Sequence, residues 1–166
     1  MKVTEFTHRW VIDNVKYQAV DNLKSAIFSS PGADKSRFYL FLTDYRMVDV
    51  RLALLSSLEP DVQVKWKLEV LDKSGKPAIS KCNHNSLELI DMQIFTLYFP
   101  FADSGNDRLK PVDKDRAYGT HSIIDLNITS DVFLNRNDII RRDGSMILVA
   151  TVCKKYRLII FNFDPI

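Results

Sequence analysis

One segment, Val62–Leu71, constrains the fold of this chain more than any other. Its apolar residues occupy every second position: Val62, Val64, Trp66, Leu68 and Val70. The intervening polar residues are Gln63, Lys65, Lys67 and Glu69. This alternation predicts a strand with one buried face and one solvated face. The residues that follow, Asp72 to Gly75, have the composition of a turn.

Short apolar and aromatic runs separated by polar turns recur along the chain, which is typical of an all-β sandwich or barrel. Besides 62–71, they predict strands at residues 6–12, 24–28, 37–43, 48–57, 87–101, 118–128 and 146–152. No segment sustains the 3.6-residue period of a helix beyond about two turns. Ser130–Leu134 is expected to form a single helical turn, with Thr129 or Ser130 as its N-cap. Residues 1–153 are interpreted as one domain, and residues 154–166 as a basic and then apolar tail.

Composition and charge exclude several classes of protein. The chain has 166 residues, of which 46% are hydrophobic and 27% charged, as in a globular domain. A net charge of +2 is too small to indicate nucleic-acid binding. No apolar run approaches the length of about 20 residues that a membrane span needs. A cytoplasmic or nuclear location is expected, with Cys82 and Cys153 reduced.

The sequence lacks the motifs that usually carry catalysis or metal binding. The three histidines, His8, His84 and His121, are not spaced as zinc ligands. No nucleophile motif and no glycine-rich phosphate loop are found. We therefore expect no metal, no cofactor and no enzymatic activity. The basic run 154–157 is interpreted as the solvated end of a strand.

Five short motifs, in the same order along the chain, resemble MATH domains, also called TRAF-homology domains. The first strand combines Phe6, Trp10, Ile12 and Asn14. Residues 28–30, 52–56 and 62–75 resemble the second-strand ending and central strands of the speckle-type POZ group of this family. Residues 117–124 and 132–152 resemble the family's late motif and closing strand. The similarity covers roughly residues 3–153.

The resemblance implies both a fold and a function. The fold is an antiparallel β-sandwich of about eight strands, and the function is binding of extended peptides in a shallow groove beside an exposed strand. The partners would be extended segments of substrate or receptor proteins. In the speckle-type POZ group a BTB domain follows and recruits a cullin ubiquitin ligase, so this chain would be either the excised substrate-recruiting part or a stand-alone domain.

The resemblance also places two central-strand residues in the groove. Trp66 falls where the family has a groove phenylalanine, and it should then be partly exposed and face Tyr118. Because it shares a strand face with Val64 and Leu68, the alternative is that it belongs to the core. Arg51 falls where the speckle-type POZ group has a groove tyrosine. A cation there favours acidic or phosphorylated peptides, unless the side chain is simply solvated.

The late motif adds five candidate positions: Arg116, Tyr118, Gly119, Thr120 and His121. Tyr118 and Gly119 keep the aromatic and the small residue of the family's Trp-Gly-Phe, whereas Thr120 loses the second aromatic. The strand expected at 87–101 would supply a further wall residue, Tyr98 first and Phe99 second, unless its aromatics are core.

Two other functions remain open at this point. A TRAF-type oligomeric signalling adaptor would use the same groove for receptor tails, although residues 1–5 show no heptads of a preceding coiled coil. A small-ligand-binding or enzymatic β-sandwich would instead need a deep pocket with a metal or paired carboxylates.

Overall fold

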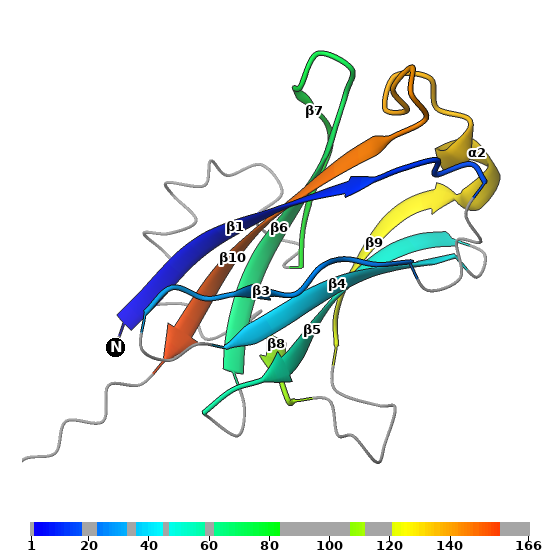
Figure 1. Cartoon of the computed structure of the whole chain (residues 1–166). Coiled ribbons are helices and arrows are strands. Elements are labelled where there is room, and N and C mark those ends of the chain that lie inside the picture. The colour runs from blue at the N-terminus through cyan, green and yellow to red at the C-terminus, as the bar shows by residue number, and fades with distance from the viewer. Residues whose placement is uncertain are drawn as a thin grey trace, which may run out of the picture.

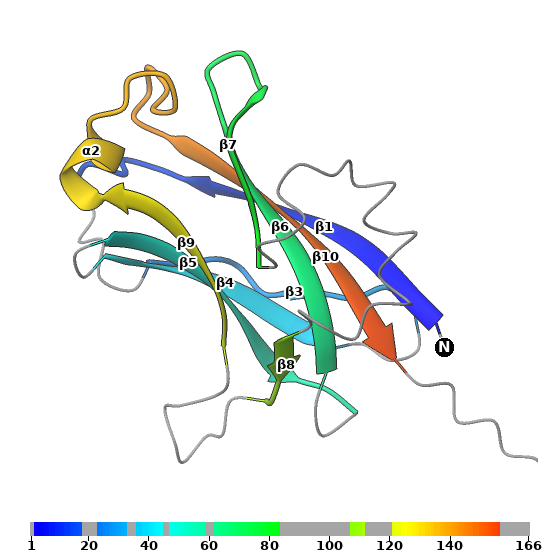
Figure 2. The same cartoon turned by 180° about the vertical axis from the view of Figure 1, so that it is seen from behind.

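The computed structural model describes residues 2–17, 23–32, 36–44, 47–58, 62–83, 107–111 and 121–156. They form two antiparallel sheets packed face to face, together with one short helix (Figure 1). The view from behind shows the same two layers, with the long strands of each sheet curving together (Figure 2). The prediction of an all-β sandwich is confirmed.

Sheet A contains the first and the last described strands of the chain. Its strand order is β1 (Lys2–Ile12), β10 (Met146–Tyr156), β6 (Val62–Leu71) and β7 (Pro77–Cys82). The short strand β8 (Asp107–Leu109) also pairs with β6. The alternating segment is therefore a central strand, and its observed bounds match the predicted ones.

Sheet B is built mainly from the middle of the chain. Its order is β2 (Leu23–Lys24), β4 (Arg37–Asp44), β5 (Met47–Ser56) and β9 (Ser122–Thr129), and β3 (Phe28–Ser29) pairs with β4. Within the described residues, β9 forms one edge of this sheet. β9 leads directly into the helical turn α2 (Ser130–Leu134), as predicted. Thr129 is its N-cap residue, but the Thr129 side chain accepts no capping hydrogen bond from the turn.

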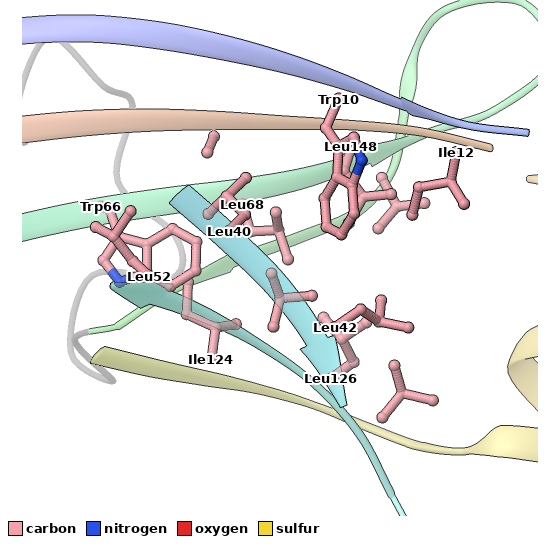
Figure 3. Close-up of a cluster of buried hydrophobic side chains, with 14 of the residues drawn as sticks. Trp10, Ile12, Leu40, Leu42, Leu52, Trp66, Leu68, Ile124, Leu126 and Leu148 are labelled. Atoms are coloured by element: carbon pink, nitrogen blue, oxygen red, sulfur yellow. The ribbon is translucent and has the colours of Figure 1, made fainter. Parts of the chain in front are cut away.

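The core lies between the sheets and is made by alternate residues of the long strands. In β6 the inward residues are those predicted from the sequence, and all are fully buried: Val62, Val64, Trp66, Leu68 and Val70. Figure 3 shows Trp66 close to Leu52 and Ile124 of sheet B. Burial of the inward side chains of both sheets holds the two layers together. The stabilisation is about 25 cal/mol for each Å² of apolar surface removed from water.

The inward residues of β1 extend this core with an aromatic cluster. The ring of Phe6 lies 5.5 Å from that of Phe38 and 6.1 Å from that of Phe28. His8 stacks on Phe28, with ring centroids 4.3 Å apart and planes nearly parallel. Trp10 is 8% exposed and belongs to the core. The alternation predicted for the first strand is confirmed.

Two lysines that the sequence predicted to be solvent-exposed are buried. Lys65 lies on the outer face of sheet A, yet only 1% of its surface is exposed. Lys154 was expected to begin a solvated tail, but it is fully buried in β10, which continues to Tyr156. The domain boundary proposed after residue 153 therefore falls inside a strand. An alternating pattern identifies the two faces of a strand but not what covers each face.

Other differences concern short strands. The strand predicted at 24–28 is replaced by β2 and β3, two residues each, which pair with different parts of β4. β7 and β8 were missed because their sequences are short and polar. Of the strand predicted at 118–128, β9 begins at Ser122, and residues 118–120 lie outside the described residues. The strand predicted at 87–101 lies outside the described residues.

Candidate functional site

The outer face of sheet B carries a group of aromatic and basic side chains. In β4 and β5 the inward residues include Phe38, Leu40, Leu42, Val48, Val50, Leu52 and Leu54. The alternate residues therefore point away from the core. Strand register places Lys24, Phe41, Arg51 and Ile123 in one row across β2, β4, β5 and β9. We call Lys24, Tyr39, Phe41, Arg51 and His121 the Phe41 cluster.

The cluster is organised around the ring of Phe41. The ring of His121 meets it edge-on at 4.7 Å, and the ring of Tyr39 lies 6.0 Å away. The Cζ atom of Arg51 lies 5.9 Å from the centroid of Phe41, and the Nζ atom of Lys24 lies 5.6 Å from that of Tyr39. These distances are in the range of cation–π contacts. Phe41 is consequently only 8% exposed, although it points away from the core.

The electrostatics of the cluster favour an anion. Burial, together with the charges of Arg51 and Lys24, lowers the pKa of His121 below its ordinary value. Arg51 pairs with Asp49 through its Nε atom at 3.1 Å, and its side chain keeps 32% of its surface exposed. Within the described residues, its terminal Nη groups make no hydrogen bond. They can therefore donate to an incoming carboxylate or phosphate.

Acidic side chains occupy the next row of the same face. Strand register places Thr43, Asp49 and Asp125 side by side on β4, β5 and β9. The Thr43 hydroxyl donates a hydrogen bond to Asp49, which fixes the carboxylate beside Arg51. The face thus changes from basic to acidic within one strand repeat of two residues.

Of the residues expected in the groove, Trp66 is in the core. It is fully buried on the inner face of β6, so the expectation of a partly exposed wall is wrong. The reason is the opposite sheet, which covers the inward side of β6 with apolar side chains such as Leu52 (Figure 3).

Trp66 instead anchors a polar network at one end of the sandwich. Its indole Nε1 donates to the Ser122 hydroxyl at 2.8 Å, and its backbone N–H donates to Asn83 Oδ1 at 3.0 Å. Ser122 and Asn83 both donate to the carboxylate of Asp107. The network ties β6 and the end of β7 to β8 and β9. It thereby joins the two strands on either side of residues 110–121, a stretch that includes the first part of the late motif at 117–124.

Of the residues expected in the groove, Arg51 and His121 both lie against the ring of Phe41. The remaining candidates lie outside the described residues: Tyr98, Phe99, Arg116, Tyr118, Gly119 and Thr120. Sequence reasoning missed Lys24, Tyr39 and Phe41. In a strand at residues 37–43 Tyr39 and Phe41 share one face, because side chains alternate between faces, but only the pairing of β4 with β5 places them beside Arg51.

The described residues contain no cluster of three or more His, Cys, Asp or Glu side chains arranged to hold a metal. In the same part of the chain, no helix is long and apolar enough to cross a membrane. No protein-family model matches this chain, and no curated protein matches it.

Proposed function

We propose that this chain is a protein-interaction module that binds extended peptides across the outer face of sheet B. The single observation that carries this proposal is the Phe41 cluster. It combines exposed cationic groups with aromatic surface on one face, and two of its residues were candidates from the sequence alone. Arg51 is proposed to recognise an acidic or phosphorylated side chain of the peptide.

The edge strand β9 offers a way for an extended peptide to dock. Within the described residues it pairs on one side only, with β5. A peptide can add to such an edge through backbone hydrogen bonds, with alternate side chains over the sheet face. Ile123, which is 46% exposed, would give it an apolar contact. Asn127, with φ of 54°, interrupts the regular strand, and the register between β5 and β9 shifts at this point, between Met47 and Asp49.

The two rows of charge imply a preference in the peptide sequence. A side chain over the row of Arg51 and Ile123 meets a cation, whereas one placed two residues away meets Asp49 and Asp125. Because residues i and i+2 of an extended chain share a face, the preferred peptide would carry an acidic and a basic residue two positions apart.

The resemblance to MATH domains supports the same function. The two-sheet antiparallel sandwich is the fold that this resemblance implies, and recruitment of substrates to a cullin ubiquitin ligase is the cellular role we propose if a BTB domain accompanies the chain. A signalling adaptor that reads receptor tails would use the same surface, and the two roles differ in the partner rather than in the binding chemistry.

Selection of random displayed peptides on the purified domain tests the proposal. We expect enrichment of peptides with an acidic residue, and we expect Arg51→Ala to weaken the selected peptide about fivefold, since it removes a charge-assisted hydrogen bond. Arg142→Ala, an exposed arginine outside the cluster, is the matched control and should leave affinity unchanged. A motif that lacks acidic residues, or that Arg51→Ala leaves intact, would refute the assignment.

Binding of an acidic peptide should also be coupled to proton uptake. The pKa of His121 is lowered in the isolated domain by burial and by two neighbouring cations. A bound carboxylate or phosphate would raise it again, so the complex holds more protons than the free domain and affinity rises as pH falls below about 6.5. Calorimetry in buffers of different ionisation enthalpy measures this uptake. His121→Gln should abolish it, and equal uptake by the variant would exclude His121 as its source.

A further inference from the structure

The first strand of the domain is a long edge strand. β1 has 11 residues and pairs with β10 along its whole length, from Lys2 opposite Tyr156 to Ile12 opposite Met146. On its other side no described strand pairs with it. It contains neither proline nor glycine, two residues that commonly keep an edge from pairing. Such an edge is suited to extension by another strand.

The outward side chains of β1 follow a symmetric order. With Phe6, Trp10 and Ile12 directed inward, the outer face carries Val3, Glu5, Thr7, Arg9 and Val11. Of these, Glu5, Thr7, Arg9 and Val11 are exposed. Thr7 lies at the centre of this order. A charged residue follows on each side, Glu5 on one and Arg9 on the other, and a valine follows each charged residue.

We propose that β1 pairs antiparallel with β1 of a second copy of this chain, with Thr7 opposite Thr7. In this register Glu5 of each copy lies opposite Arg9 of the other, and Val3 lies opposite Val11. Opposite charges and β-branched pairs directly across an antiparallel ladder are stabilising, whereas like charges are not. Sheet A then continues across the two-fold axis into the second copy.

Of the neighbouring registers, this one places Glu5 of each copy opposite Arg9 of the other. A shift that centres the axis on Phe6 places Glu5 opposite Thr7 and Arg9 opposite Val3. A centre on His8 places Arg9 opposite Thr7 and Glu5 opposite Val11. Only the axis through Thr7 pairs Glu5 with Arg9, and the two-fold symmetry gives two such ion pairs per dimer. This complementarity favours a second copy over an unrelated strand as the occupant of the edge.

The proposal is independent of the peptide site, because β1 belongs to sheet A and the Phe41 cluster lies on the outer face of sheet B. The contact would be weak. A single strand pair buries less than the roughly 1,200 Å² of a standard stable interface, so dissociation constants in the micromolar to millimolar range, about 0.01–1 mM, are expected.

Sedimentation equilibrium of the full chain up to about 1 mM tests the proposal, since this range spans the expected affinity. We expect a monomer–dimer equilibrium. Arg9→Glu should weaken it at least tenfold, because it creates two like-charge pairs per dimer. Combining Arg9→Glu with Glu5→Arg should restore it. Two results would overturn the proposal. One is a monomer over the whole concentration range, which would leave the edge empty or open to an unrelated strand. The other is a dimer that Arg9→Glu does not weaken.

A second readout covers the case in which the charge reversal disturbs folding, since Glu5 also contacts the Cys153 thiol at 3.8 Å within its own chain. Thr7→Cys places a thiol on the two-fold axis and should form an intermolecular disulfide between the two position-7 thiols under mild oxidation. Val11→Cys, at another exposed position of the same strand, lies opposite Val3 and should not link to itself. Equal cross-linking of the two variants, or none at position 7, contradicts the register.

Discussion

Replacing Trp66 with alanine is expected to lower the free energy of unfolding by about 3–5 kcal/mol, the usual cost of truncating a buried tryptophan. Trp66 is fully buried between the sheets, so the substitution leaves a large cavity beside Leu52 and Ile124. It also removes the hydrogen bond from the indole to Ser122. Urea denaturation followed by circular dichroism measures the loss.

A milder change separates packing from hydrogen bonding. Trp66→Phe keeps most of the apolar volume but leaves the Ser122 hydroxyl without the indole donor, so a smaller loss of about 1–2 kcal/mol is expected. The folded variant should bind a selected peptide as the wild-type domain does. If Trp66→Ala cost less than about 1 kcal/mol, well under the usual range for a core tryptophan, the side chain would have to be a surface residue after all.

Lys154 is expected to make the stability of the domain depend on pH in the alkaline range. Its ammonium is buried between the sheets and donates to the Ser36 hydroxyl at 2.7 Å, and Ser36 in turn contacts the Ser57 hydroxyl at 3.0 Å. Hydroxyls replace only part of the hydration that burial removes. Burial accordingly lowers the pKa of Lys154 from 10.5 to about 8.

The direction of the effect follows from proton counting. Between pH 8 and 10.5 the unfolded chain keeps a proton on Lys154 that the folded domain has released, so stability rises with pH. Near pH 7 both states are charged, and the folded state bears the full cost, on the order of 1–2 kcal/mol after allowance for solvent screening. Burial also raises the pKa of Cys153 from 9.0 to about 12, which lowers stability above pH 9. The measurement therefore belongs between pH 7 and 9.

The variant Lys154→Met tests this assignment. It should stabilise the domain at pH 7 by about the cost of the buried charge, on the order of 1–2 kcal/mol, and it should flatten the rise between pH 7 and 9. Lys67→Met, at a partly exposed lysine on the outer face of sheet A, is the matched control and should change neither quantity appreciably. A rise with pH that persists in Lys154→Met would assign it to another group.

The parts of the fold that sequence reasoning predicted are those with a strong local signal. β6 has its period-two pattern and α2 its short polar start, and both were placed at their observed bounds. β7 and β8 have no such signal. They are strands because they pair with β6, which their own residues do not indicate.

The burial of charge could not be predicted in the same way. Lys65 and Lys154 occupy opposite faces of sheet A, and both are buried. A local pattern shows that residue 65 alternates with residues 64 and 66, but not what covers it in the folded chain. For Lys154 the decisive partner is Ser36, 118 residues away along the chain.

The candidate site, too, could be predicted only where the sequence itself carries a signal. Arg51 was placed through the resemblance and His121 through the late motif, and tertiary structure brought them to one ring, that of Phe41. The choice between core and groove at Trp66 depended on the position of sheet B, which no pattern within β6 contains.

The most direct test of the central claim is a titration of the isotope-labelled domain with a selected acidic peptide, followed by nuclear magnetic resonance. If the outer face of sheet B is the binding surface, the largest shifts should fall on Phe41, Arg51, His121 and Ile123. The amides of Thr7 and Thr151, on the outer face of sheet A, should remain unchanged. Shifts confined to sheet A, or none on β5 and β9 at saturation, would contradict the account.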